Sequence, residues 1–341
     1  MSDAAGVKAL LQTVATGATL SPDAMASAID VMTAEATPPQ MAAFLMGLRV
    51  RGETREEITG AAKALRAKMT AVSIAPGAID IVGTGGDGHG TFNVSTGAAI
   101  VAAGAGLKVA KHGNRSVSSL SGASDVLSAL GVKLDCGPDL IAQAIDQAGV
   151  GFLWAPAHHP AMKAWAAARA ELGVRTLFNL LGPICNPAGV RHHVLGVFDA
   201  AWVMPMAEAL RALGSERAWV VHGHDGLDEL STTGPTMVAA LDGGTITSFE
   251  VTPEDAGLAR VSLADLKGGD GAHNAQALRE LLAGAPGPYR DIVLMNTAAA
   301  LIVAGKAGSL AEGVAAAEEA ISSGRAAAAL DRLVAISQST A

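Results

Sequence analysis

From residue 79 onward, short apolar runs alternate with helical segments, and this alternation restricts the fold more than any other feature of the sequence. The strand candidates are Ile79–Val82, Leu107–Ala110, Val132–Leu134, Gly151–Trp154, Val194–Phe198, Ala218–Val221 and Met237–Leu241. Strands that are separated by helices pair in parallel, and a parallel sheet needs helices on both faces. We therefore expect an α/β fold whose central sheet is mainly parallel and is flanked by helices.

The first 70 or so residues carry helix signals only. Ser21, Thr37 and Thr54 each stand where a capping residue begins a helix. A further helix is predicted over Pro160–Leu172, and the segment Thr176–Pro187 after it has no clear strand. We place both segments beside the N-terminal helices. The expected division is a small helical domain of residues 1–72 plus about 160–187, and a larger α/β domain of residues 77–158 and 190–341.

Charge and composition exclude several classes of protein. The net charge of -8 argues against general nucleic-acid binding, which needs a basic surface. The two cysteines, Cys136 and Cys185, lack the spacing of metal ligands. The longest apolar stretches, such as residues 97–107, are too short to span a bilayer, and the first residues lack a signal pattern. We expect a cytoplasmic protein with neither a nucleic-acid nor a membrane partner.

A glycine-rich loop, Gly83-Thr84-Gly85-Gly86-Asp87, follows the first apolar run. Glycines let backbone N–H groups approach a phosphate closely, and the helix that begins near Ser95 adds the positive end of its dipole. The loop matches neither the dinucleotide fingerprint nor the P-loop, so alone it is equally typical of a tight turn between a strand and a helix. Asp87 suits a ribose hydroxyl or a bound metal.

A second polar loop, Lys111-His112-Gly113-Asn114-Arg115-Ser116, follows the next apolar run. Lys111 can neutralise a phosphate as a point charge, and Arg115 could bind one through two N–H groups. Either loop alone could be a solvated surface loop. Because two such loops can meet at one edge of a parallel sheet, their complementary composition predicts a site for a highly phosphorylated ligand.

The acidic segment Asp225–Glu229 follows another predicted strand. Its three carboxylates repel one another unless a cation lies among them. Mg²⁺ takes few protein carboxylates and completes its shell with water and phosphate oxygens, which suits a diphosphate. On spacing alone, a solvated acidic turn is an equal alternative.

Arg169 stands on an otherwise apolar helix face, which it shares with Met162, Trp165 and Leu172. An arginine that reaches out to water is the common explanation for this pattern. The alternative is an arginine that binds a carboxylate, which near an apolar cleft would hold an aromatic acid. His158 and His159 precede the same helix without a third ligand at zinc spacing, so we interpret them as residues that start the helix.

Taken together, these segments resemble the anthranilate phosphoribosyltransferase family of tryptophan biosynthesis. The resemblance rests on segments in the family's order: Gly83–Asp87, Asn93–Thr96, Lys111–Arg115, Asp125–Leu127, His159–Met162, Asn179–Pro183, Asn186-Pro187 and Asp225–Glu229. It implies a homodimer formed through the helical domain. It also implies an Mg²⁺-dependent transfer of phosphoribose from phosphoribosyl pyrophosphate to the amine of anthranilate, with about two Mg²⁺ ions per active site.

The resemblance also implies roles for individual positions. Those expected to bind phosphoribosyl pyrophosphate are Gly83, Gly86, Asp87, Thr91, Asn93, Ser95, Thr96, Lys111 and Ser119. Those expected to bind anthranilate are Gly83, His112, Asn114, Arg169, Gly182 and Pro183. The expected metal ligands are Ser95, Asp228 and Glu229, and the expected catalytic residues are Lys111, Asp228 and Glu229.

Two alternatives remain open at this point. A pyrimidine nucleoside phosphorylase shares the implied fold and a glycine-rich phosphate loop, but phosphorolysis does not need the acidic segment Asp225–Glu229. A non-catalytic relative that binds nucleic acid is disfavoured by the net charge of -8.

Overall fold

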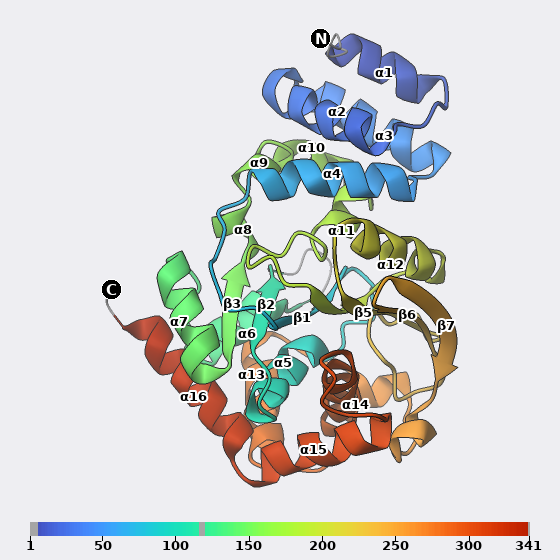
Figure 1. Cartoon of the computed structure of the whole chain (residues 1–341). Helices are drawn as coiled ribbons and strands as arrows, with labels where there is room; N and C mark the ends of the chain where they lie inside the picture. Colours follow the sequence, from blue (N-terminus) through green and yellow to red (C-terminus); the bar gives the residue numbers. More distant parts are fainter. Residues whose placement is uncertain (1–5, 116–119, 340–341) are drawn as a thin grey trace.

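The computed structural model describes residues 6–115 and 120–339. At one end lies a group of helices whose bounds are α1 Val7–Ala15, α2 Pro22–Glu35, α3 Pro38–Arg51 and α4 Arg55–Ala67 (Figure 1). The expected capping residues precede three of them. Ser21 Oγ accepts from the N–H of Ala24 at 3.3 Å, and Thr54 Oγ1 accepts from that of Glu57 at 3.3 Å. Each cap satisfies a donor that the first helical turn leaves without a partner.

The rest of the chain builds one seven-stranded sheet in the order β3-β2-β1-β4-β5-β6-β7. The strands are β1 Ile79–Gly83, β2 Val109–Gly113, β3 Val150–Trp154, β4 His192–Gly196, β5 Arg217–Gly223, β6 Thr236–Asp242 and β7 Thr245–Val251. Strands β1 to β5 pair in parallel, whereas β6 and β7 are antiparallel to their neighbours. The expectation of an α/β fold with a mainly parallel sheet is confirmed.

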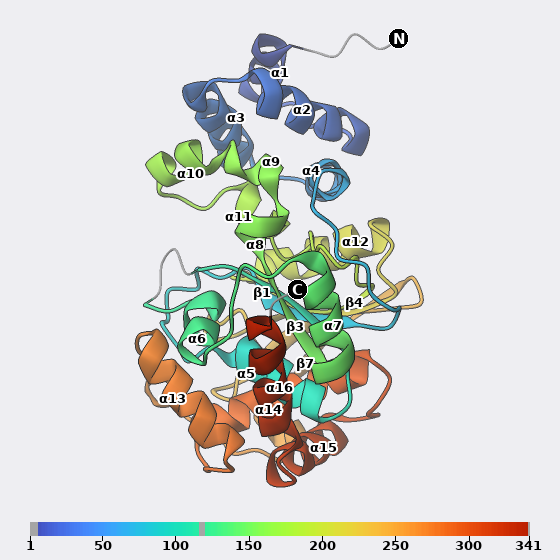
Figure 2. The same cartoon turned by 90° about the vertical axis from the view of Figure 1, so that its left-hand side faces the viewer.

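Helices cover both faces of this sheet (Figures 1 and 2). The helices after α4, which include three that lie away from the sheet (α9 to α11), have the bounds α5 Val94–Gly104, α6 Ala123–Ala129, α7 Pro138–Ala148, α8 Ala155–His158, α9 Pro160–Lys163, α10 Ala166–Leu172, α11 Leu177–Leu181, α12 Val203–Ala212, α13 Gly271–Leu282, α14 Pro288–Val303, α15 Leu310–Ser322 and α16 Arg325–Gln338. The side chains of successive strand residues point to opposite faces of the sheet. Ile81 packs with α5 and α14, whereas Val82 belongs to a second core that continues into α1–α4.

Three sequence predictions differ from the structure. Val132–Leu134 is not a strand, because the backbone N–H of Lys133 donates to Ser337 of α16 at 3.0 Å and the segment turns toward α7. Strand β7 was not predicted, because it is an edge strand that is exposed along most of its length and so lacks an apolar run. The helix predicted over Pro160–Leu172 is broken into α9 and α10.

The segment from α9 to α11 lies beside the N-terminal helices (Figure 2). Helix α10 packs on α3, and α11 packs on α3 and α4. Trp165 anchors the segment: it is fully buried, and its indole N–H donates to Thr33 Oγ1 in α2 at 2.9 Å. Over residues 6–115 and 120–339, no helix is both long and apolar enough to cross a membrane.

Candidate active site

Three loops meet at the carboxyl end of the parallel strands. The first follows β1, as expected, and the third is the acidic loop after β5. The second begins later than expected, because β2 continues to Gly113 and so Lys111 and His112 lie in the strand itself. The backbone N–H of Gly85 donates to Asp228 Oδ2 at 2.6 Å, and that of Ser95 donates to Glu229 Oε1 at 3.1 Å. A Cβ atom at Gly83 would lie 2.4 Å from Asp228 Oδ2, so only glycine allows this approach.

Lys111 lies at the centre of these loops. Its side chain is buried, and Nζ donates to the carbonyl of Ile81 at 2.8 Å and to Ser95 Oγ at 3.2 Å. Burial lowers the pKa of Lys111, and the neighbouring carboxylates of Asp80, Glu229 and Asp228 oppose that shift. The lysine therefore connects β2 to the start of α5, close to the acidic pair.

The acidic pair consists of Asp228, which is buried, and Glu229, which is half-buried. Desolvation, followed by the charge of Asp87, raises the pKa of Asp228 to about 7. Desolvation, followed by the charge of Asp228, raises the pKa of Glu229 to about 8. Carboxylates arranged in this way are stabilised by a cation. The donor set consists of oxygen atoms and therefore fits Mg²⁺.

The protein would supply only a few of the ligands of such an ion. Among the described residues, no three His, Cys, Asp or Glu side chains already converge on one metal position. This is the usual situation for Mg²⁺, which keeps several waters and binds phosphate oxygens as well as one or two carboxylates.

Asp225 does not belong to this pair. Its Oδ2 accepts from Ser231 Oγ and from Thr233 Oγ1, both at 2.6 Å, and its Oδ1 accepts from the N–H of Leu227 at 3.0 Å. These bonds fix the conformation of the acidic loop. The third carboxylate near Asp228 is instead Asp87 of the first glycine loop.

The other expected donor-binding residues lie along the first loop and the start of α5. Asn93 precedes α5, and its Oδ1 accepts from Asn274 Nδ2 at 2.8 Å, a support from α13 that the sequence did not reveal. Thr96 is buried, and its hydroxyl has no partner among the described residues. Thr91 pairs with Lys267 in an isolated bridge. Ser119 lies outside the described residues.

His112, in β2, contacts His159, which directly follows α8. Its Nε2 lies 3.2 Å from Nε2 of His159, so a single N–H is shared between the two rings. Burial, followed by His159 and His158, holds the pKa of His112 well below its usual value, so the ring is neutral. We interpreted His159 only as the start of a helix, because nothing in the sequence connects it to a residue 47 positions earlier.

Asp80 of β1 binds the end of β2 and is not among the site residues expected from the sequence. Its carboxylate is fully buried and accepts from the N–H of His112 at 3.1 Å and from Asn186 Nδ2 at 2.7 Å. Desolvation raises the pKa of Asp80 to about 6, which Lys111 opposes. The Asn-Pro element that follows α11 is thereby tied to the same loop.

Arg169 and Asn114 lie outside the cluster around Lys111. The Arg169 guanidinium packs 5.2 Å from the centre of the Phe178 ring, and burial lowers its pKa. Asn114 is exposed, and its Oδ1 accepts from the N–H of Arg115 at 2.8 Å. Within the described ranges, no hydrogen bond joins either residue to the acidic pair. Gly182 and Pro183 follow α11, and a Cβ at Gly182 would meet no atom within 4 Å.

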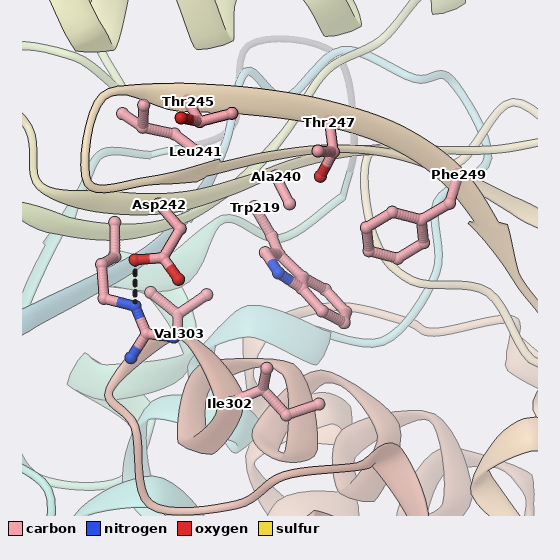
Figure 3. A pocket seen from close by; sticks show the side chains of 10 residues that line it. Trp219, Ala240, Leu241, Asp242, Thr245, Thr247, Phe249, Ile302 and Val303 are labelled. Carbon is pink, nitrogen blue, oxygen red and sulfur yellow. Dashed lines mark ion pairs between the residues drawn. The ribbon is translucent and has the colours of Figure 1, made fainter.

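A depression of about 440 Å³ lies away from these loops, between the antiparallel strands and α14 (Figure 3). Trp219 and Phe249 contact each other edge to face there, with ring centres 5.5 Å apart, and Arg217 pairs with Asp242 at 3.2 Å. None of the candidate site residues lines it, so the depression is separate from the candidate active site.

The chain matches two family models. The one described as "Glycosyl transferase family, a/b domain" matches residues 75–327, and the one described as "Glycosyl transferase family, helical bundle domain" matches residues 8–69. The fold and the loops at its strand ends thus define an enzyme of the glycosyltransferase class.

More specifically, the chain belongs to the anthranilate phosphoribosyltransferase family. It is 60% identical to a curated relative of that name from Bradyrhizobium sp., over 98% of this chain and 99% of the relative. A Rhodopseudomonas palustris relative of the same name is 58% identical, over 97% of this chain and 98% of the relative.

Solved structures of this family superpose closely on the chain. The anthranilate phosphoribosyltransferase of Thermus thermophilus has a TM-score of 0.91 and 44% identity, over 97% of this chain and 99% of its own. The Saccharomyces cerevisiae protein in complex with PRPP (phosphoribosyl pyrophosphate) and Mg has a TM-score of 0.90 and 32% identity, over 98% of both chains. The same yeast protein in complex with 4-fluoroanthranilate has a TM-score of 0.88 and 30% identity, over 99% of this chain and 100% of its own.

Proposed function

We propose that this chain transfers the phosphoribosyl group of phosphoribosyl pyrophosphate to the amine of anthranilate and releases pyrophosphate, in tryptophan biosynthesis. One observation carries the proposal: Lys111 is bonded to Ser95, while Asp228 and Glu229 are bonded to the loop and helix that follow β1. The yeast relative's complexes with PRPP and Mg and with 4-fluoroanthranilate support both substrates.

The donor is bound by the first glycine loop, the start of α5 and Lys111. We assign this role to Gly83, Gly86, Asp87, Thr91, Asn93, Ser95, Thr96, Lys111 and Ser119. About two Mg²⁺ ions are held by Asp228, Glu229 and Ser95, and they neutralise charge on the departing pyrophosphate. Lys111 serves the same purpose, with a charge that is already positioned before the donor binds.

The acceptor is bound on the side of α8 to α11. We assign this role to Gly83, His112, Asn114, Arg169, Gly182 and Pro183. A guanidinium pairs with the carboxylate of anthranilate, and a neutral His112 offers a hydrogen bond without repelling Lys111. An aromatic amine needs no deprotonation before it attacks. The enzyme's task is therefore to orient the amine toward the anomeric carbon as the bond to pyrophosphate breaks.

The larger organisation is also a proposal. Residues 1–72 with about 160–187 form a helical domain that mediates homodimerisation, and residues 77–158 and 190–341 form the domain that binds the donor. The family match over residues 8–69 supports the first boundary. Val50 of α3 supports the interface, because this apolar side chain is 81% exposed in the single chain. We place the enzyme in the cytoplasm, without nucleic-acid or membrane partners.

The fluorescence of anthranilate tests this function. We expect the signal to fall only when phosphoribosyl pyrophosphate and Mg²⁺ are both present. A parallel reaction with uridine or thymidine and inorganic phosphate tests the nucleoside phosphorylase alternative. Release of the free base in that reaction, with a constant anthranilate signal in the first, would overturn the proposal.

A further inference from the structure

Arg175 reaches the first glycine loop from the segment between α10 and α11. Its Nη2 donates to the carbonyl of Gly86, 89 residues earlier in the chain. The guanidinium also packs over the ring of Phe198, with its Cζ 4.4 Å from the ring centre. Neither Arg175 nor Phe198 is among the site residues expected from the sequence. The flat face of the guanidinium rests on the ring while its edge serves the loop, an arrangement that lysine cannot reproduce.

This contact acts on the part of the loop that is least fixed by its own chain. Gly85 and Gly86 both have positive φ values, 67° and 76°, and have no side chains that would restrict them. The loop is held on one side by the bond from Gly85 N–H to Asp228. Arg175 provides a second contact, through the carbonyl of Gly86.

The planarity of the peptide bond gives this second contact a consequence for the ligand. In a trans peptide, the carbonyl of one residue and the N–H of the next point in opposite directions. Because the carbonyl of Gly86 points toward Arg175, the N–H of Asp87 points away from it. A flipped peptide would present a carbonyl oxygen where this N–H now lies, and an anion would be repelled.

We propose that Arg175 is a positioning residue for the phosphorylated donor: it fixes the Gly86–Asp87 peptide with the N–H of Asp87 directed toward the donor's phosphate oxygens. The identity of the donor rests on the function proposed above. Since Arg175 belongs to the segment that packs with α3 and α4, it also connects that side of the molecule directly to the donor loop.

The kinetic test replaces Arg175 and compares the two substrates. We expect Arg175→Gln to raise KM for phosphoribosyl pyrophosphate about tenfold or more, as expected for the loss of a charged hydrogen bond, and to leave KM for anthranilate within about twofold. Arg175→Lys should rescue part of the loss. The control is Arg191→Gln, because Arg191 Nε also donates to a glycine carbonyl, that of Gly214 at 2.9 Å, outside the site. Equal rises of both KM values would reduce Arg175 to a structural role and overturn the proposal.

Hydrogen exchange provides a test without turnover. In the ligand-free protein, amides of residues 83–92 should exchange faster in Arg175→Gln than in the wild type, and Arg191→Gln should match the wild type. Phe198→Leu, which removes the ring but keeps the arginine, should give a smaller increase and keeps the test valid if Arg175→Gln folds poorly. Unchanged exchange in both variants would refute the positioning role. Failure of the wild type to use the donor would instead refute the proposed function.

Discussion

The backbone N–H of Gly85 donates to Oδ2 of Asp228 at 2.6 Å and so joins two loops that lie 143 residues apart in the sequence. The same carboxylate lies 2.4 Å from the position of a Cβ at Gly83. The phosphate loop and the acidic loop are therefore one unit before any ligand binds. A cation at Asp228 would lie beside the loop that we assign to the donor phosphates.

The acidic pair should make the metal-free protein less stable at high pH. In the unfolded chain these carboxyl groups lose their protons near their ordinary pKa values of 3.8 and 4.5, whereas the folded chain raises these values to about 7 and about 8. The stability from the retained protons is complete below about pH 4 and is lost as the pH rises through 7 and 8. We expect Tm without metal to fall by several degrees between pH 6 and 9, and Mg²⁺ to reverse the fall.

The double variant Asp228→Asn, Glu229→Gln provides the comparison, because its amides do not titrate. Its Tm should vary less with pH and should not respond to Mg²⁺. Asp242→Asn is the matched control, since Asp242 is an exposed carboxylate that pairs with Arg217 far from the site. If wild type and double variant have the same pH dependence, the raised pKa values of the pair are wrong.

Arg169 should affect the acceptor alone. The guanidinium packs on Phe178 and forms no ion pair with a described carboxylate, so its charge is available for a ligand. We expect Arg169→Ala to raise KM for anthranilate about 10- to 100-fold, with KM for the donor nearly unchanged. Lys163→Ala, at an exposed lysine in the preceding helix, is the control. Equal loss toward both substrates would reject the assignment of Arg169.

Glu57 should matter for stability but not for catalysis. This fully buried carboxylate accepts from Arg51 Nη2 at 2.5 Å and from the N–H groups of Leu20 and Thr54, both at 3.0 Å. Glu57→Ala leaves both amides without a partner and removes the carboxylate that neutralises Arg51, so it should cost about 3–5 kcal/mol of unfolding free energy. Glu56→Ala, at the exposed neighbour, should cost less than about 1 kcal/mol in urea denaturation. A similar loss of unfolding free energy in both variants would show that the buried hydrogen bonds of Glu57 stabilise the fold no more than an exposed ion pair.

The alternation of apolar runs and helices predicted the fold class because burial on both faces leaves a strong local pattern. It failed at β7, whose exposed edge position requires no apolar run. It also failed at Val132–Leu134, an irregular segment whose apolar residues pack against the core. A run of apolar residues indicates that a segment is buried, but a buried segment does not always pair as a strand. The break between α9 and α10 was likewise invisible, since no proline or glycine marks it.

The site residues, too, could be predicted only where the local sequence carries a signal. Lys111 and the acidic pair could be proposed from the sequence because they lie in or just after the ends of strands that share one edge of the sheet. The prediction that Asp225 joins the other two carboxylates was wrong, because spacing does not show that its Oδ2 accepts hydrogen bonds from Ser231 and Thr233. His159 and Arg175 were missed, because their partners are brought close only by the tertiary fold.

The most direct test of the account is the equilibrium binding of phosphoribosyl pyrophosphate with and without Mg²⁺, measured calorimetrically in the absence of anthranilate. The central claim is that Asp228 and Glu229 hold the metal for the diphosphate. We predict that Mg²⁺ increases donor affinity at least about tenfold in the wild type and in Asp242→Asn, as charge-assisted contacts to phosphate require. The same increase in the Asp228→Asn, Glu229→Gln variant would contradict that claim.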